Sequence, residues 1–137
     1  AKSMQERSGE YSQMIDIVKT NPFTGVGIGQ YTLAYGKSEP GLPVWVYQPI
    51  HNTIILIFVE TGLIGFILFV MWFTSIDQIN YKVKKMANGM FGMGLGTVVL
   101  VLALFDHYLW SSWAGLALAA FCFALMLRWS LEVKTPS

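Results

Sequence analysis

The sequence predicts an all-α membrane protein in which three transmembrane helices follow an extracytoplasmic segment that contains an amphipathic helix. Of the 137 residues, 54% are hydrophobic and only 12% are charged, whereas soluble domains carry about 25% charged residues. The charges are also separated by apolar stretches that approach the ~20 residues needed to cross a bilayer as a helix. The same composition excludes an intrinsically disordered chain, and a net charge of +1 gives no indication of nucleic-acid binding.

Three segments are apolar enough to span a membrane: residues 53–76, 86–105 and 109–127. We therefore divide the chain into an external region, residues 1–52, and a three-helix transmembrane region, residues 53–137. The second span contains closely spaced glycines, which let helix backbones approach one another. These glycines are Gly89, Gly92, Gly94 and Gly96.

Positive charges orient the spans. The first and second spans are separated by Lys82, Lys84 and Lys85, and the third is followed by Arg128 and Lys134. Because Lys and Arg in short loops mark the cytoplasmic side, both clusters fit if the first span runs from outside to inside. Residues 1–52 and the turn at residues 106–108 are then predicted to share the extracytoplasmic face.

The external region begins with a predicted helix over about residues 3–20. Ser3 and Glu6 have the spacing of a capping box, and an amphipathic stripe follows them. The stripe consists of Tyr11, Met14, Ile15 and Val18. Arg7 lies at the head of that stripe, one helical turn before Tyr11. We interpret Arg7 either as a snorkelling side chain or as a cation directed at an anionic ligand.

Residues 21–52 are predicted to be a loop. Its first part, residues 21–29, contains three glycines whose spacing differs from the nucleotide-binding fingerprint. We therefore expect a tight turn, with glycines where a side chain would collide. Further along, Trp45 and Tyr47 are aromatic residues of the kind that lie at membrane interfaces, or that form a stacking surface for sugars.

His51 and Asn52 precede the first span. Asn52 is a good N-cap, so His51 lies at a helix N-terminus, where free backbone N–H groups attract anions such as phosphate. A neutral imidazole beside a bound diphosphate is a candidate general base, whereas the alternative is a structural histidine. Glu60 falls within the first span, near its outer end, where an ionisable residue usually faces protein or water. We expect Glu60 to make a polar packing contact with the glycine-rich span or with helices outside this chain.

The turn between the second and third spans brings Asp106, His107 and Tyr108 to the external face. It adds a carboxylate and a second imidazole to the face that carries Arg7 and His51, and the simpler interpretation is a solvated turn with aromatic anchors. The sequence contains no HExxH motif and no Cys–His cluster, so we predict neither a metal site nor a cofactor.

Taken in order, these motifs resemble the O-antigen ligase and polymerase family of bacterial membrane proteins. The family's arginine, about fifteen residues before an N-P-x-x-G-V-G turn, is matched by Arg7 and Pro22. Its H-N and E-x-G-x-x-G patterns are matched by His51, Asn52, Glu60, Gly62 and Gly65. Tyr11 stands where tryptophan is commoner. The resemblance covers nearly the whole chain, and we expect the chain to be the C-terminal third of a longer protein.

The resemblance implies a helical bundle like that of C-type glycosyltransferases, in the bacterial inner membrane. It implies transfer of a glycan from undecaprenyl diphosphate to an acceptor hydroxyl of a glycan or glycolipid, without a metal, by a ligase or a polymerase. Arg7 and His51 then correspond to the family's functional Arg and His, and Arg7 is expected to bind the diphosphate. The remaining candidates for substrate binding are Asn52, Trp45, Tyr47, Asp106 and His107.

We expect the site to be completed by membrane lipid and by the remaining helices of the parent protein, so that this chain alone is inactive. The alternative function is a non-catalytic membrane module or part of a transporter. A transporter predicts several intramembrane charges along a path, and only Glu60 has that position in the sequence.

Overall fold

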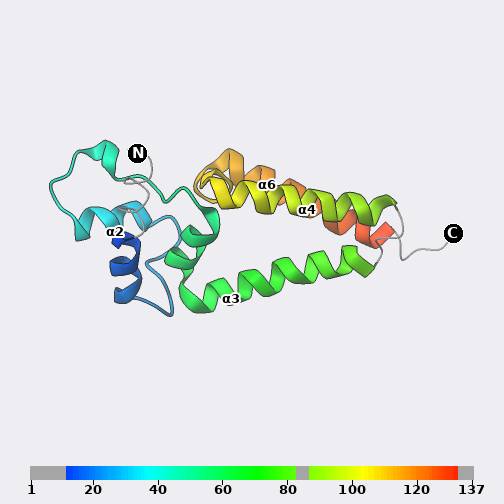
Figure 1. Cartoon of the computed structure of the whole chain (residues 1–137), viewed down its shortest axis with the longest axis horizontal. Coiled ribbons are helices and arrows are strands. Elements are labelled where there is room, and N and C mark those ends of the chain that lie inside the picture. The colour runs from blue at the N-terminus through cyan, green and yellow to red at the C-terminus, as the bar shows by residue number, and fades with distance from the viewer. Residues whose placement is uncertain (1–11, 83–86, 133–137) are drawn as a thin grey trace.

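A computed structural model describes residues 12–82 and 87–132 of the chain. These residues are helical with connecting turns and contain no strand, which confirms the all-α prediction for this part of the chain. The order is a helix over residues 12–20, α2 (Tyr31–Ser38), a 3-10 turn (Val44–Val46), α3 (Thr53–Lys82), α4 (Ala87–Phe105), α5 (Tyr108–Ser111) and α6 (Trp113–Glu132). The three long helices α3, α4 and α6 form a bundle, and the N-terminal elements lie beyond one end of it (Figure 1).

Within the described residues, one helical stretch is long and apolar enough to cross a membrane, namely Thr53–Tyr81 of α3. The apolar stretches of the other two long helices, Gly89–Phe105 and Trp113–Trp129, are shorter. The last helix begins at Trp113 instead of residue 109, because residues 108–111 form the separate α5 and Ser112 has an extended backbone, with φ −119° and ψ 146°. The number of three spans therefore stays a prediction.

Helix α3 is broken at Gly62, where the backbone has φ 67° and ψ −172°. Figure 1 shows the segment before Gly62 running across the direction of the segment after it. A break leaves backbone C=O groups without partners on one side and N–H groups on the other, and the loop at residues 22–27 supplies both kinds of partner. The first predicted span, residues 53–76, is therefore helical on both sides of Gly62 but is not one straight helix, because a segment distant in sequence supplies the hydrogen bonds that stabilise the break.

Four backbone hydrogen bonds join the loop to the two halves of α3. On the near side of the break, Val26 N–H donates to Val59 O at 3.1 Å, and Gly27 N–H donates to Glu60 O at 2.9 Å. On the far side, the N–H groups of Leu63 and Ile64 donate to Pro22 O at 3.0 Å and Phe23 O at 3.2 Å. The loop backbone thus replaces the helical turn that the break removes.

Two glycines make this close approach possible. A Cβ atom on Gly25 would collide with the backbone of Glu60 and Gly62, and a Cβ atom on Gly62 would collide with the backbone of Phe23 and Gly25. Both glycines also have positive φ, +70° and +67°, which L-residues with a side chain rarely adopt. The prediction that the loop glycines stand where a side chain would collide is confirmed for Gly25.

The N-terminal elements pack on the first half of α3 through a small hydrophobic core. Its buried members are Ile17, Tyr31, Tyr35, Ile50, Leu56 and Val59. The predicted stripe of the first helix is wrong at one position, because Ile17 is 2% exposed whereas Ile15 is 49% exposed. The start of that predicted helix, including Ser3, lies outside the described residues. Helix α2 falls within the predicted loop, and it buries two tyrosines one helical turn apart, Tyr31 and Tyr35.

The glycine-rich helix α4 packs closely on its neighbours, as predicted. Gly92 faces the fully buried side chain of Asn80, and Gly96 faces the end of Met126, with a Cβ position 2.8 Å from Met126 Cε. Gly94 has open space around it, so it does not contribute to this packing.

The break makes a prediction about stability. We expect Gly25→Ala and Gly62→Ala each to lower the free energy of unfolding by more than the ~1–3 kcal/mol that a strained backbone conformation costs, because each new methyl group meets backbone atoms. The measurement is the thermal unfolding midpoint of the purified protein in detergent. Gly94→Ala is the matched control and should not lower the midpoint, since its Cβ meets open space and alanine favours a helix over glycine by about 0.5–1 kcal/mol. Equal midpoints for all three variants would contradict the role of the break.

Candidate functional site

The candidate site lies where α3 begins and where α4 passes into α5. Asn52 caps α3 as predicted, because its Oδ1 accepts a hydrogen bond from the N–H of Ile55 at 3.0 Å. Its Nδ2 donates to Leu104 O at 3.1 Å, at the end of α4. Asn52 therefore fixes the residue before it, His51, next to the turn that follows α4.

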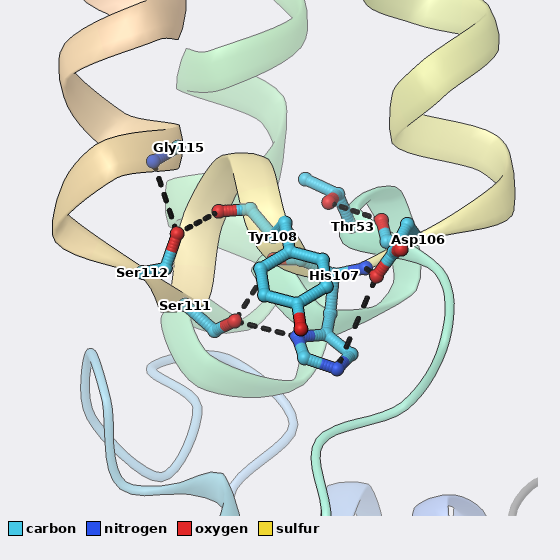
Figure 2. A network of polar contacts seen from close by, with 7 residues as sticks. All are labelled: Thr53, Asp106, His107, Tyr108, Ser111, Ser112 and Gly115. Carbon is cyan, nitrogen blue, oxygen red and sulfur yellow. Dashed lines mark hydrogen bonds and ion pairs between the residues drawn. The ribbon is translucent and has the colours of Figure 1, made fainter.

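A second contact joins the same two elements. The carbonyl oxygen of Asp106 accepts hydrogen bonds from both Thr53 N–H, at 3.1 Å, and Thr53 Oγ1, at 2.6 Å. The Asp106 carboxylate accepts a hydrogen bond from the N–H of His107 at 2.6 Å, which shapes the turn into α5. Figure 2 shows this network from Thr53 to Gly115.

The turn carries His107 to the side of His51. The two imidazole ring centroids lie 5.3 Å apart with an interplanar angle of 65°. His107 Nδ1 lies 2.6 Å from Ser111 Oγ, its Nε2 lies 4.0 Å from Asp106 Oδ1, and its ring stacks on Tyr108 at 5.1 Å (Figure 2). Three sequence-predicted residues, His51, Asp106 and His107, are thus brought together from segments more than fifty positions apart.

The other predicted residues are placed differently. Trp45 is 76% exposed on the 3-10 turn, which lies apart from the start of α3 (Figure 1). Tyr47 makes structural contacts within residues 39–47: its hydroxyl donates a hydrogen bond to Glu39 O at 2.7 Å and accepts one from Leu42 N–H at 3.0 Å. Its ring also packs edge-on against Tyr35 at 5.2 Å. Arg7 lies outside the described residues.

Glu60 makes a polar packing contact, as expected, but its partners differ from the predicted ones. The side chain is 3% exposed, and its carboxylate accepts hydrogen bonds from Gly29 N–H at 2.8 Å, Tyr31 N–H at 3.2 Å and Trp110 Nε1–H at 2.7 Å. The partners thus belong to the external loop, α2 and α5, and the expected contact with the glycine-rich α4 is wrong. The break at Gly62 explains this, because the external loop packs directly against it.

An apolar cavity of about 620 Å³ lies between the two halves of α3 and the helices α4 and α6. Its lining includes Ile57 and Phe69 from either side of the break, together with Ala103 and Ala119. It also includes Thr53, Leu104 and Trp110, which belong to or adjoin the polar contacts described above. The cavity therefore reaches residues that are close in sequence to His51 and His107, and it extends between apolar helix faces.

Sequence reasoning missed three residues of this arrangement, namely Thr53, Trp110 and Ser111. None of them forms a motif with its sequence neighbours, and only its partner in space gives it a role. Among the described residues, no group of three or more His, Cys, Asp or Glu side chains is arranged to hold a metal ion.

The contact between Thr53 and Asp106 predicts a measurable stability change. Thr53 is 4% exposed, so Thr53→Val keeps the shape and removes one buried hydrogen bond. We expect a loss of about 0.5–1.5 kcal/mol in the free energy of unfolding, because one hydrogen bond is removed while the Asp106 carbonyl keeps Thr53 N–H as a partner. Denaturant unfolding in detergent measures the change. Thr97→Val is the matched control, since Thr97 is exposed and donates only within its own helix, and it should change stability by less than about 0.5 kcal/mol. Equal losses in the two variants would contradict the assignment.

A comparison with known protein families agrees with the resemblance that the ordered motifs indicate. Residues 1–70, which are 70 of the 137 residues, match the family model described as O-antigen ligase. The matched segment contains Arg7, the glycine loop, His51 and Glu60, whereas Asp106 and His107 lie beyond it. No curated protein and no solved structure matches the chain. The ordered motifs and the family match together identify the chain as a member of the O-antigen ligase family of bacterial membrane proteins.

Proposed function

We propose that this chain carries the acceptor-activating end of a membrane transferase. The enzyme moves a glycan from undecaprenyl diphosphate to an acceptor hydroxyl, as an O-antigen ligase or polymerase. The observation that carries the proposal is the imidazole pair, His51 and His107, whose sequence neighbours Thr53 and Leu109 line the apolar cavity. Family membership supports the broader role in polysaccharide assembly.

The cavity supports a lipid-linked donor. Such a donor has a long apolar chain, a charged diphosphate and a glycan, and these three parts need different surroundings. Each CH₂ group of the donor's lipid chain contributes about 0.8 kcal/mol when it leaves water. In a bilayer the lipid chain is already in an apolar environment, so the cavity serves to hold the donor in one position. A segment of the lipid chain in the cavity would bring the attached diphosphate beside Thr53 and Trp110. The diphosphate would then lie near His51, two residues before Thr53.

In the proposed reaction, the ring of His51 removes the proton from the acceptor hydroxyl. The resulting oxygen attacks the anomeric carbon of the donor glycan, and the bond between that carbon and the diphosphate oxygen breaks. Undecaprenyl diphosphate leaves with the bonding electron pair, and the proton stays on His51 until it passes to solvent. His107 lies edge-on to His51 and limits the orientations of its ring.

The role of Arg7 rests on its place in the sequence. A guanidinium group forms paired hydrogen bonds with phosphate oxygens, and it stabilises the charge that develops on the leaving group. Asn52 and Asp106 organise the imidazole pair from either side. Trp45 and Tyr47 are proposed to contact the glycan or the acceptor away from the reacting atoms.

The proposal predicts that His51→Ala and Arg7→Ala in the full-length parent protein each reduce transfer by at least about 100-fold. This is the range for loss of a general base, as in His51→Ala, and for loss of a group that stabilises developing charge, as in Arg7→Ala. The measurement is glycan transfer from a purified undecaprenyl-diphosphate-linked donor, with membrane fractionation to verify insertion. Lys19→Ala is the control for Arg7, because Lys19 is an exposed cation paired with Asp16, and it should keep full activity.

Two outcomes would decide the roles. Full transfer by either alanine variant would contradict the assignment. Arg7→Lys should also be poor, because a point charge cannot form the paired hydrogen bonds, and near-normal transfer would indicate that charge alone suffices.

The cavity makes a separate prediction. Ala119→Phe places a ring in the cavity, and we expect the KM for the lipid-linked donor to rise about tenfold, the change that ~1.4 kcal/mol of lost binding produces. The kcat should change little, because the reacting groups are untouched. Ala117→Phe is the matched control, since Ala117 is exposed two positions away on α6, and it should leave both constants unchanged. An unchanged KM in Ala119→Phe would show that the donor chain lies elsewhere.

A further inference from the structure

Glu60 is a buried carboxylate whose hydrogen bonds reach two separate parts of the molecule. Within the described residues, its three hydrogen-bond donors are neutral N–H groups. Two of these donors, on Gly29 and Tyr31, belong to the external region, and the third is the indole N–H of Trp110. A buried carboxylate needs several such hydrogen bonds to offset its desolvation. The hydrogen bond from Trp110 adds a connection to α5 that the donors on Gly29 and Tyr31 do not provide.

Trp110 lies on the short helix that His107 begins. The N–H groups of Trp110 and Ser111 both donate to His107 O at 3.0 Å, and Ser111 Oγ contacts the His107 ring. The backbone that carries Trp110 is therefore hydrogen-bonded to the backbone that carries the imidazole. Because α5 has only four residues, it has little stability of its own, and its position depends on contacts with its neighbours.

Two contacts join this turn to α3, one on each side of His107. Asp106 is bonded to Thr53 at the start of α3, and Trp110 is bonded to Glu60 beside the break, at 2.7 Å. With only one of these contacts, the turn could rotate about that contact. Two contacts, one before and one after His107 in the sequence, fix the orientation of the turn. His51 belongs to the same end of α3, so the second contact also fixes the distance between the two imidazoles.

We propose that the hydrogen bond between Glu60 and Trp110 is a positioning contact that sets the place of His107 beside His51. Glu60 and Trp110 then act on transfer through the imidazole pair, and neither takes part in proton transfer itself. This inference rests on the proposed function for its effect on rate, while its effect on imidazole position is independent of that function.

The test is Trp110→Phe in the full-length parent protein. The variant keeps an aromatic ring against the cavity and leaves the two loop bonds of Glu60 in place, so it removes one N–H donor. We expect kcat to fall about 10- to 100-fold, the effect of a misplacement near 1 Å, with a donor KM within about twofold of the original. Trp113→Phe is the matched control, because Trp113 is 91% exposed, and it should leave kcat unchanged. An unchanged kcat in Trp110→Phe, or a raised KM with normal kcat, would overturn the proposal.

A second measurement does not depend on activity. In the full-length protein labelled with ¹⁵N-histidine, the imidazole signals of His51 and His107 are assigned by His51→Gln and His107→Gln. We expect Trp110→Phe to shift both signals and Trp113→Phe to shift neither. Unchanged signals in Trp110→Phe would overturn the positioning role even if transfer falls. If the original protein shows no transfer, the proposed function fails, and the two imidazole signals still decide whether this contact positions them.

Discussion

The hydrogen bonding of the external loop to the broken backbone of α3 is the constraint on which the rest of the structure depends. A helix break leaves peptide groups without partners, and within a membrane protein such groups are expensive. Here Pro22 and Phe23 supply acceptors, and Val26 and Gly27 supply donors. The loop therefore provides hydrogen-bond partners for the helix backbone on both sides of the break. The N-terminal region and the helical bundle are therefore joined by main-chain contacts and do not depend on a flexible connection.

The break has consequences on both of its sides. On the external side, it turns Glu60 toward the loop and α5, where its carboxylate has three N–H partners. On the bundle side, the segments of α3 before and after the break line the apolar cavity together with α4 and α6. A polar site and an apolar cavity thus meet at one place because one helix changes direction there. This arrangement suits an amphiphilic ligand better than a soluble one.

The candidate site draws on both halves of the chain. The family match ends at residue 70, so it contains His51 but neither Asp106 nor His107, which the turn after α4 contributes. The contacts that unite them are short and local in space: Thr53 with Asp106, Asn52 with Leu104, and one imidazole with the other. The family segment and the final two long helices are therefore packed as one structural unit, with the imidazole pair at their junction.

The sequence by itself determined the all-α class, the long helical regions and the N-cap at Asn52, because composition, helical period and capping are local properties of the chain. It did not determine the break in α3 or the helix at residues 31–38, and it did not identify Gly29, Tyr31 and Trp110 as the partners of Glu60. The tertiary structure alone decided that Trp110 binds Glu60 and that His107 lies 5.3 Å from His51. Each of these contacts joins residues about fifty positions apart, and such pairs are selected by the packing of whole elements, which no local pattern records.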